Sequence, residues 1–89
     1  MSVNTNGMRM IRCAANGTYS LEGFVIVAVI AAESTTLMGK AVEGDDFLAS
    51  GTYASGTGES LIVSQVVEGM WSEIKVGAGR CYAYVSKIA

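Results

Sequence analysis

The most apolar run in the chain spans residues 23–32 and contains no polar side chain. Five of its ten residues are β-branched, a class whose stiff χ1 torsion fits a pleated sheet better than a helix. Side chains of a regular strand alternate between the two faces of a sheet, and here both sets are apolar. One set is Phe24, Ile26, Ala28 and Ile30, and the other is Val25, Val27 and Val29. We therefore predict a central strand covered on both faces.

Turn signals separate this strand from other short apolar segments. The clearest is Asn16-Gly17, a pair typical of two-residue hairpin turns, and it predicts a hairpin between residues 8–15 and 18–21. Further strands are predicted at residues 47–54, 59–68, 70–76 and 80–88, with residues 35–41 as a short strand or an irregular crossing. The spacing favours an all-β fold, a small antiparallel β-sandwich or barrel-like roll of about six to seven strands.

The length of 89 residues predicts one domain with a small core. Residues 1–7 are small and polar, so we expect a flexible arm there, followed by a single β domain over residues 8–89. Residues 59–69 leave two interpretations open. Their apolar positions also match helical spacing and a glycine ends the segment, but the β-branched content favours strand.

Charge is scarce. Charged residues make up 16% of the chain, against about 25% in typical domains, whereas apolar residues make up 51%. Too few charges remain to cover a small domain, so we expect part of the apolar surface to be hidden against other subunits. A monomer with a Ser, Thr and Gly surface is the alternative.

The charges are also segregated along the chain. All eight acidic residues lie between positions 22 and 73, where Lys40 is the only base. The remaining bases are Arg9, Arg12, Lys75, Arg80 and Lys87. If the terminal strands fold side by side, the molecule has a basic end and an acidic body, which suits docking onto another copy or a partner.

Residues with the usual catalytic or ligand chemistry are few. There is no His, the commonest general base and metal ligand. Glu43, Asp45 and Asp46 lack the spacing of a calcium loop, and in residues 51–60 Thr57 stands where a phosphate-binding loop needs Lys. Cys13 and Cys81 lie on the first and last predicted strands, and we expect buried thiols rather than a bridge. We predict no enzyme activity and no cofactor or metal site.

Two further partner classes are not expected. The acidic balance opposes nucleic-acid binding, since only Arg9 and Arg12 form a basic pair on one strand. Residues 23–32 are half the length of the ~20 residues that a membrane-spanning helix needs. The first residues show no basic segment before a long apolar core, so we expect no signal peptide and a cytoplasmic site of synthesis.

Aromatic residues near the end of the chain are candidates for subunit contacts. Trp and Tyr combine a large contact area with a polar group, which suits interfaces, although Trp71 could equally serve as the large central side chain of a small core. These aromatic residues, the strand that is apolar on both faces and the basic end together define a predicted interface. Its residues are Val25, Val27, Val29, Trp71, Arg80, Tyr82 and Tyr84.

Residues 18 to 84 resemble a type of small all-β virion protein of tailed bacteriophages. The resemblance rests on Thr18-Tyr19-Ser20-Leu21 before the apolar strand, the loop 54–57, and the ending 68–84, which is similar to a shared Gly-aromatic-Ser close followed by Ala-Tyr. Ser55 stands where such proteins usually have Pro. The resemblance implies decoration or cementing of capsids, or a head-fibre or tail module, often as a trimer.

The expected function is therefore that of a non-enzymatic phage structural protein. The first expectation is a capsid decoration or cement subunit, assembled in the host cytoplasm as a homo-oligomer, with a trimer favoured, on the major capsid protein or another virion protein. The alternative is a small binding module that recognises a receptor at a tail or fibre, or a host factor.

Overall fold

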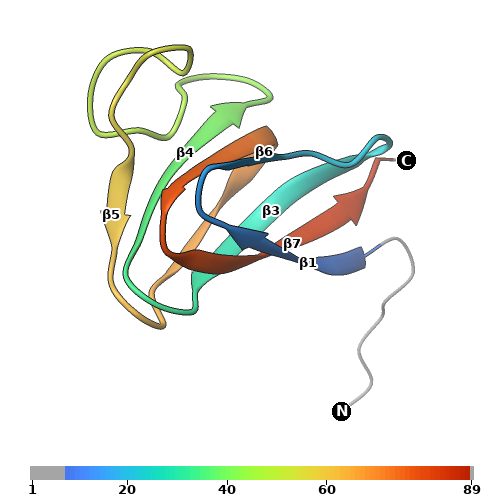
Figure 1. Cartoon of the computed structure of the whole chain (residues 1–89). Helices are drawn as coiled ribbons and strands as arrows, with labels where there is room; N and C mark the ends of the chain where they lie inside the picture. The colour runs from blue at the N-terminus through green and yellow to red at the C-terminus, as the bar shows by residue number, and fades with distance from the viewer. Residues whose placement is uncertain (1–7, 89) are drawn as a thin grey trace.

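The computed structural model describes residues 8–88, and the predicted arm at residues 1–7 lies outside them. Within residues 8–88 the fold is all-β, as predicted, with no helix and seven strands in one antiparallel sheet (Figure 1). The strands are β1 (Met8–Ala14), β2 (Gly17–Tyr19), β3 (Phe24–Ala31), β4 (Thr35–Ala41), β5 (Glu59–Leu61), β6 (Val66–Ala78) and β7 (Arg80–Lys87).

The apolar run forms β3, which lies inside the sheet between β6 and β7. Its predicted alternation is wrong in its second half. A β-bulge between Ile26 and Ala28 inserts Val27 as an extra residue, which reverses the faces that follow. Ile26 and then Val29 therefore point into the core, at 1% and 0% exposure. The two faces of β3 are divided differently from the simple even and odd sets.

The sheet rolls up because β1 and β2 pair with different strands. The turn at Asn16 forms as predicted, with φ of 61°. The two arms do not form the expected hairpin ladder, however, since β1 pairs with β7 and β2 with β6. Tyr19 folds over Gly17, and its hydroxyl oxygen lies 2.9 Å from the amide nitrogen and 3.1 Å from the carbonyl oxygen of Ala14. The pairings close a barrel-like path through β7, β3, β6 and the bent β1–β2 segment.

The long strand β6 replaces two separate predicted strands. Residues 62–65 form a turn with Ser64 at φ 70°, so the predicted strand 59–68 is divided between β5 and β6, and the helical alternative is wrong. No break occurs at Gly69. Instead, a register shift opposite Lys40 and Ala41 bends β6 near Trp71, and Figure 1 shows the strand curving back on itself. The first half of β6 pairs with β3 and the second half with β2 and β4.

Residues 42–58 form a long loop, and the strand predicted at residues 47–54 is wrong because only isolated bridges occur there. Tyr53 fastens this loop to β6. The Tyr53 hydroxyl donates to Glu73 Oε2 at 2.8 Å. Lys75 Nζ donates to the Tyr53 carbonyl oxygen at 2.9 Å and lies 4.4 Å from the centroid of the Tyr53 ring. Burial, followed by the Glu73 carboxylate, raises the pKa of Tyr53.

The core lies inside the roll, and Trp71 is its largest side chain. The indole packs against the backbone of Gly39 and Gly69, where a Cβ atom at either position would lie within 3 Å of the ring. The Phe47 ring packs against the indole at an interplanar angle of 50°, with centroids 5.7 Å apart. The buried apolar residues are Cys13, Ile26, Val29, Ala31, Leu37, Leu61, Trp71, Ile74, Val76, Cys81, Ala83 and Val85.

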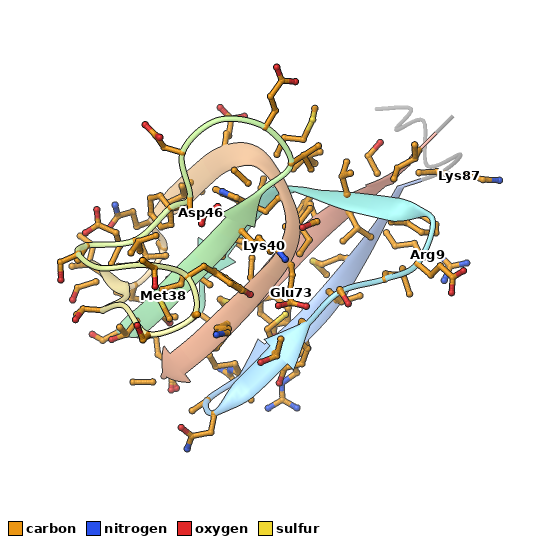
Figure 2. All side chains as sticks on the ribbon, turned by 90° about the horizontal axis from the view of Figure 1, so that it is seen from above. Arg9, Met38, Lys40, Asp46, Glu73 and Lys87 are labelled. Atoms are coloured by element: carbon orange, nitrogen blue, oxygen red, sulfur yellow. The ribbon has the colours of Figure 1, made fainter. Side chains whose placement is uncertain are left out.

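The terminal strands β1 and β7 lie side by side, as the charge pattern requires for a basic end. Figure 2 shows Arg9 and Lys87 together at one end of the molecule and Asp46 at the other. The Arg9 guanidinium lies over the Phe24 ring, 5.2 Å from its centroid, at the end of the roll. Arg9 and Lys87 therefore form a basic end, whereas Arg80 lies at the opposite end of β7 and Lys75 lies beside Tyr53, the partner of Glu73.

Candidate interaction surface

The solvent-facing side of β1, β7, β3 and the first half of β6 is a mostly apolar surface, here called the outer face. Two rows of directly opposed residues cross it, because paired residues of neighbouring strands share a face. The first row is Met10, Tyr84, Ala28 and Glu68. The second row is Arg12, Tyr82, Ile30 and Val66.

Several large side chains of these rows are open to solvent. Met10 is 57% exposed, Val66 55% and Tyr84 39%. Ile62 and Val63, in the turn before β6, are also exposed, and the backbone of this turn is hydrogen bonded to Ala31 at the end of β3. Contiguous exposed apolar groups of this kind mark interaction sites more often than isolated ones do.

The outer face is hollowed at Ala28. The small side chain of Ala28 lies between Tyr84 on β7 and the β6 strand, and a hollow of about 240 Å³ opens there. Its lining residues are Ala28, Val29, Ile30, Val66 and Tyr84. The hollow has the size and polarity to accept an apolar side chain of a partner.

Charges stand at opposite sides of the outer face. Arg12 lies on β1, at one end of the second row, and Arg80 lies on β7 opposite Ala14. Glu68 lies on β6, at the far end of the first row. The Nε atom of Arg80 is buried and has no hydrogen-bond partner within residues 8–88. One side of the face is thus basic and the other acidic.

The predicted interface residues are only partly brought together. Val25, Tyr82 and Tyr84 lie on the outer face and Arg80 at its basic side. Val27 is the half-buried residue of the bulge. Val29 and Trp71 are in the core at 0% and 4% exposure, which is a correction because such residues have no surface for a partner. The core interpretation of Trp71 is the one that the fold supports.

The predicted interface lacked six residues of the two rows that cross the outer face: Met10, Arg12, Ala28, Ile30, Val66 and Glu68. Met10 has a usable signal, since the alternation of a strand puts it on the same side as Arg12. The position of Ile30 depends on the bulge at Val27, and that of Val66 depends on where the strand begins. Neither feature has a local sequence signal.

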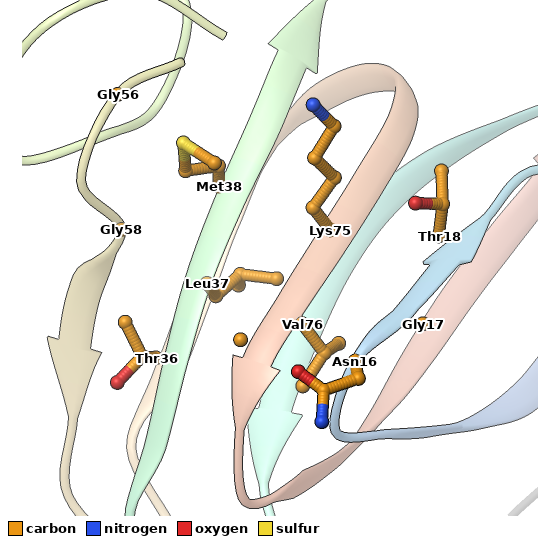
Figure 3. Close-up of a pocket in the computed structure, with 11 residues that line it drawn as sticks. Asn16, Gly17, Thr18, Thr36, Leu37, Met38, Gly56, Gly58, Lys75 and Val76 are labelled. Carbon is orange, nitrogen blue, oxygen red and sulfur yellow. The ribbon is translucent and has the colours of Figure 1, made fainter. Parts of the chain in front are cut away.

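A second concavity is a groove of about 290 Å³ between β2, β4 and the loop before β5 (Figure 3). Asn16, Thr18 and Lys75 line one wall and Thr36 and Met38 the other. Lys75 is already bound to Tyr53, so it is not a free cation for an anionic ligand. The groove offers hydroxyl, amide and backbone groups, without a nucleophile and base in contact.

A third hollow, of about 420 Å³, lies beside the acidic turn at Asp45 and Asp46. Asp46 Oδ1 accepts a hydrogen bond from the Ala41 amide at 2.8 Å, which fixes the turn. Among residues 8–88 no three His, Cys, Asp or Glu side chains gather closely enough to hold a metal ion. In the same part of the chain, no helix has the length and apolar character needed to cross a membrane.

The fold and this surface define a small all-β roll with an exposed apolar sheet face. Comparison of the chain with protein-family models, with curated proteins and with solved structures finds no match.

Proposed function

We propose that the chain is a non-enzymatic structural subunit of a bacteriophage virion, which decorates or cements the capsid by burying its outer face against a second copy of itself. The observation that carries the proposal is the exposed apolar area formed by Met10, Tyr84 and Val66. The resemblance of residues 18 to 84 to small virion proteins is the reason for proposing a bacteriophage particle as the place where the subunit assembles. The assembled subunits would then contact the major capsid protein or another virion protein.

A second copy is the occupant favoured by charge complementarity. A two-fold axis parallel to the strands sets the β1 side of one outer face over the β6 side of the other. Arg12 then approaches Glu68 of the second copy, and the apolar centres meet. The same surface therefore serves both partners, as a two-fold contact requires.

The strength of this contact is expected to be moderate. Full burial of one large apolar side chain contributes about 1.5–3 kcal/mol, but the side chains of the outer face are already partly covered. Association also costs several kcal/mol in lost freedom of motion. We therefore expect dissociation constants in the roughly micromolar range, for which the free energy is about −8 kcal/mol.

Analytical ultracentrifugation over a range of concentrations tests the contact. Met10→Lys and Tyr84→Lys each place a charge on the outer face and should weaken association by about tenfold or more. Ser60→Lys, on the exposed side of β5, is the matched control and should leave association unchanged. The measured mass separates a two-fold dimer from the trimer that the resemblance implies. A stable monomer at ~100 µM, about a hundred times the expected dissociation constant, contradicts the contact.

Mass spectrometry of purified particles tests the virion assignment separately. Particles from cells that express this chain during infection should contain it in many copies, and particles made without it should lose resistance to heat. Its absence from purified particles contradicts the assignment even if the protein self-associates. That result would favour the small binding module, for which the polar groove beside β2 is the natural ligand site.

A further inference from the structure

Cys13 and Cys81 are directly opposed on neighbouring strands. Cys13 is the partner of Cys81 in the register of β1 and β7, and both side chains are 0% exposed. Both are thiols in this structure. The chain contains no other cysteine, so each of these thiols has only the other as a possible partner within the molecule.

The register meets the distance requirement for a disulfide. Directly opposed residues of antiparallel strands have Cα atoms about 4.5–5.5 Å apart, within the range of about 4.4–6.8 Å found for disulfides. Both side chains belong to the buried core, so the two sulfur atoms lie on the same, inner face of the sheet. A diagonal pair on the same strands would be about 7–8 Å apart and would fail this requirement.

We propose that Cys13 and Cys81 form an intramolecular disulfide that fastens β1 to β7 when the protein meets an oxidising disulfide compound. This inference is independent of the proposed virion function. It assigns a modification site to a pair that was expected to remain two thiols.

The reaction is a thiol–disulfide exchange with a small disulfide such as oxidised glutathione. One protein thiolate attacks a glutathione sulfur, forming a mixed disulfide and releasing glutathione thiolate. The other protein thiolate then attacks the protein sulfur of the mixed disulfide and releases the second glutathione thiolate. The two cysteines lose two electrons and two protons in total, and one oxidised glutathione becomes two reduced molecules.

Burial opposes ionisation of both thiols in the closed sheet. Because both sulfurs are buried, the reagent reaches them only when β1 detaches. This opening is available to β1, since β7 is its single ladder partner in the described sheet.

The bond would close a loop between positions 13 and 81, 68 residues apart, which is most of the chain. Long closed loops restrict the unfolded chain strongly, so the folded state gains stability. For a domain of this size we expect the melting temperature to rise by roughly 10 °C or more. Reduction should reverse the change.

The test incubates the whole chain with oxidised glutathione, both in the folded state and during refolding from urea. Thiol titration after denaturation should find both thiols lost in the refolded sample, and the mass should fall by about 2 Da without a glutathione adduct. The melting temperature should rise and return after treatment with dithiothreitol. Refolding in the reagent removes the barrier that burial presents, so persistence of both thiols in that sample overturns the proposal.

Two variants make the test specific to the opposed pair. Cys13→Ala combined with Cys81→Ala should show no shift in melting temperature with oxidised glutathione. Cys81→Ala combined with Ala83→Cys keeps two buried cysteines but sets them diagonally, and it should remain largely reduced. Equal bond formation in the diagonal variant, or disulfide-linked dimers as the main product of the parent chain, also overturns the proposal.

Discussion

At the scale of single residues, the packing around Trp71 shows why two glycines occur inside strands that otherwise favour side chains. Gly39 on β4 and Gly69 on β6 leave space that the indole fills, so a ring larger than any other side chain fits a small core. Glycine within a strand costs about 0.5–1 kcal/mol relative to alanine. Burial of the indole offsets this cost, since large aromatic side chains contribute most to small cores.

Gly39→Ala should destabilise the protein by about 1–3 kcal/mol, because the new Cβ atom would lie 2.7 Å from Trp71 Cδ1 and force the ring to move. The measurement is the free energy of unfolding in urea. Gly77→Ala is the matched control. Its Cβ atom would have no neighbour closer than 3.9 Å, so this variant should be unchanged or slightly more stable. Equal destabilisation by both substitutions would contradict the packing account.

Tyr53→Phe should lower stability by about 1 kcal/mol at pH 8, since it removes the hydrogen bond to Glu73. Because the folded state raises the pKa of Tyr53 above its usual value of about 10, the stabilisation is complete below pH 10. This stabilisation is lost as the pH rises further, because Tyr53 ionises in the unfolded chain at a lower pH than in the folded protein. The difference between parent and variant in urea unfolding should therefore shrink above pH 10. A constant difference across this range, or none at pH 8, would argue against the contact. Tyr84→Phe, on the outer face, is the control.

At the scale of elements, the sheet has an interior and a periphery. β3 has partner strands on both sides, β7 and β6, whereas β1 is attached through β7. The bulge in β3 and the bend in β6 let the sheet close around the core, and they also decide which apolar side chains remain outside. The outer face and the opening of β1 both follow from this arrangement.

Amide hydrogens of β1 should exchange with solvent roughly tenfold faster or more than those of β3, because a peripheral strand opens without unfolding the whole sheet. Hydrogen exchange followed by mass spectrometry of peptides covering residues 8–14 and 24–31 measures the difference. Formation of the Cys13–Cys81 bond should reduce this difference in exchange rate between β1 and β3. Slower exchange in β1 than in β3 in the reduced protein would refute this account of the periphery.

At the scale of the whole molecule, the charges make one side of the outer face basic and the opposite side acidic. Arg12 and Arg80 lie on one side and Glu68 on the other, so a contact that sets the β1 side of one face over the β6 side of the other is attractive, and a contact that sets β1 over β1 is repulsive. The net charge of −2 hides this arrangement completely. Electrostatics would here select the geometry of the contact, and apolar burial would supply most of its strength.

Arg12→Glu should weaken self-association by about tenfold in ~50 mM salt and by less in ~0.5 M salt, where surface charges are screened. Combining Arg12→Glu with Glu68→Arg should restore association, because the exchanged charges meet again across the two-fold contact. Lys40→Glu, at the exposed position of β4, is the control and should have little effect. Sedimentation of the four proteins at both salt concentrations gives the result. Failure of the double variant to recover would exclude the proposed contact between Arg12 and Glu68 of the second copy.

The sequence by itself determined the features that depend on neighbouring residues. β-Branched content and turn residues predicted the all-β class, the central strand and the turn at Asn16, and alternation placed Tyr82 and Tyr84 on one face. Only the tertiary structure decided the pairing of β1 with β7, the bulge at Val27 and the burial of Trp71. These features arise from contacts between strands far apart in the chain, for which a short stretch of sequence carries no signal.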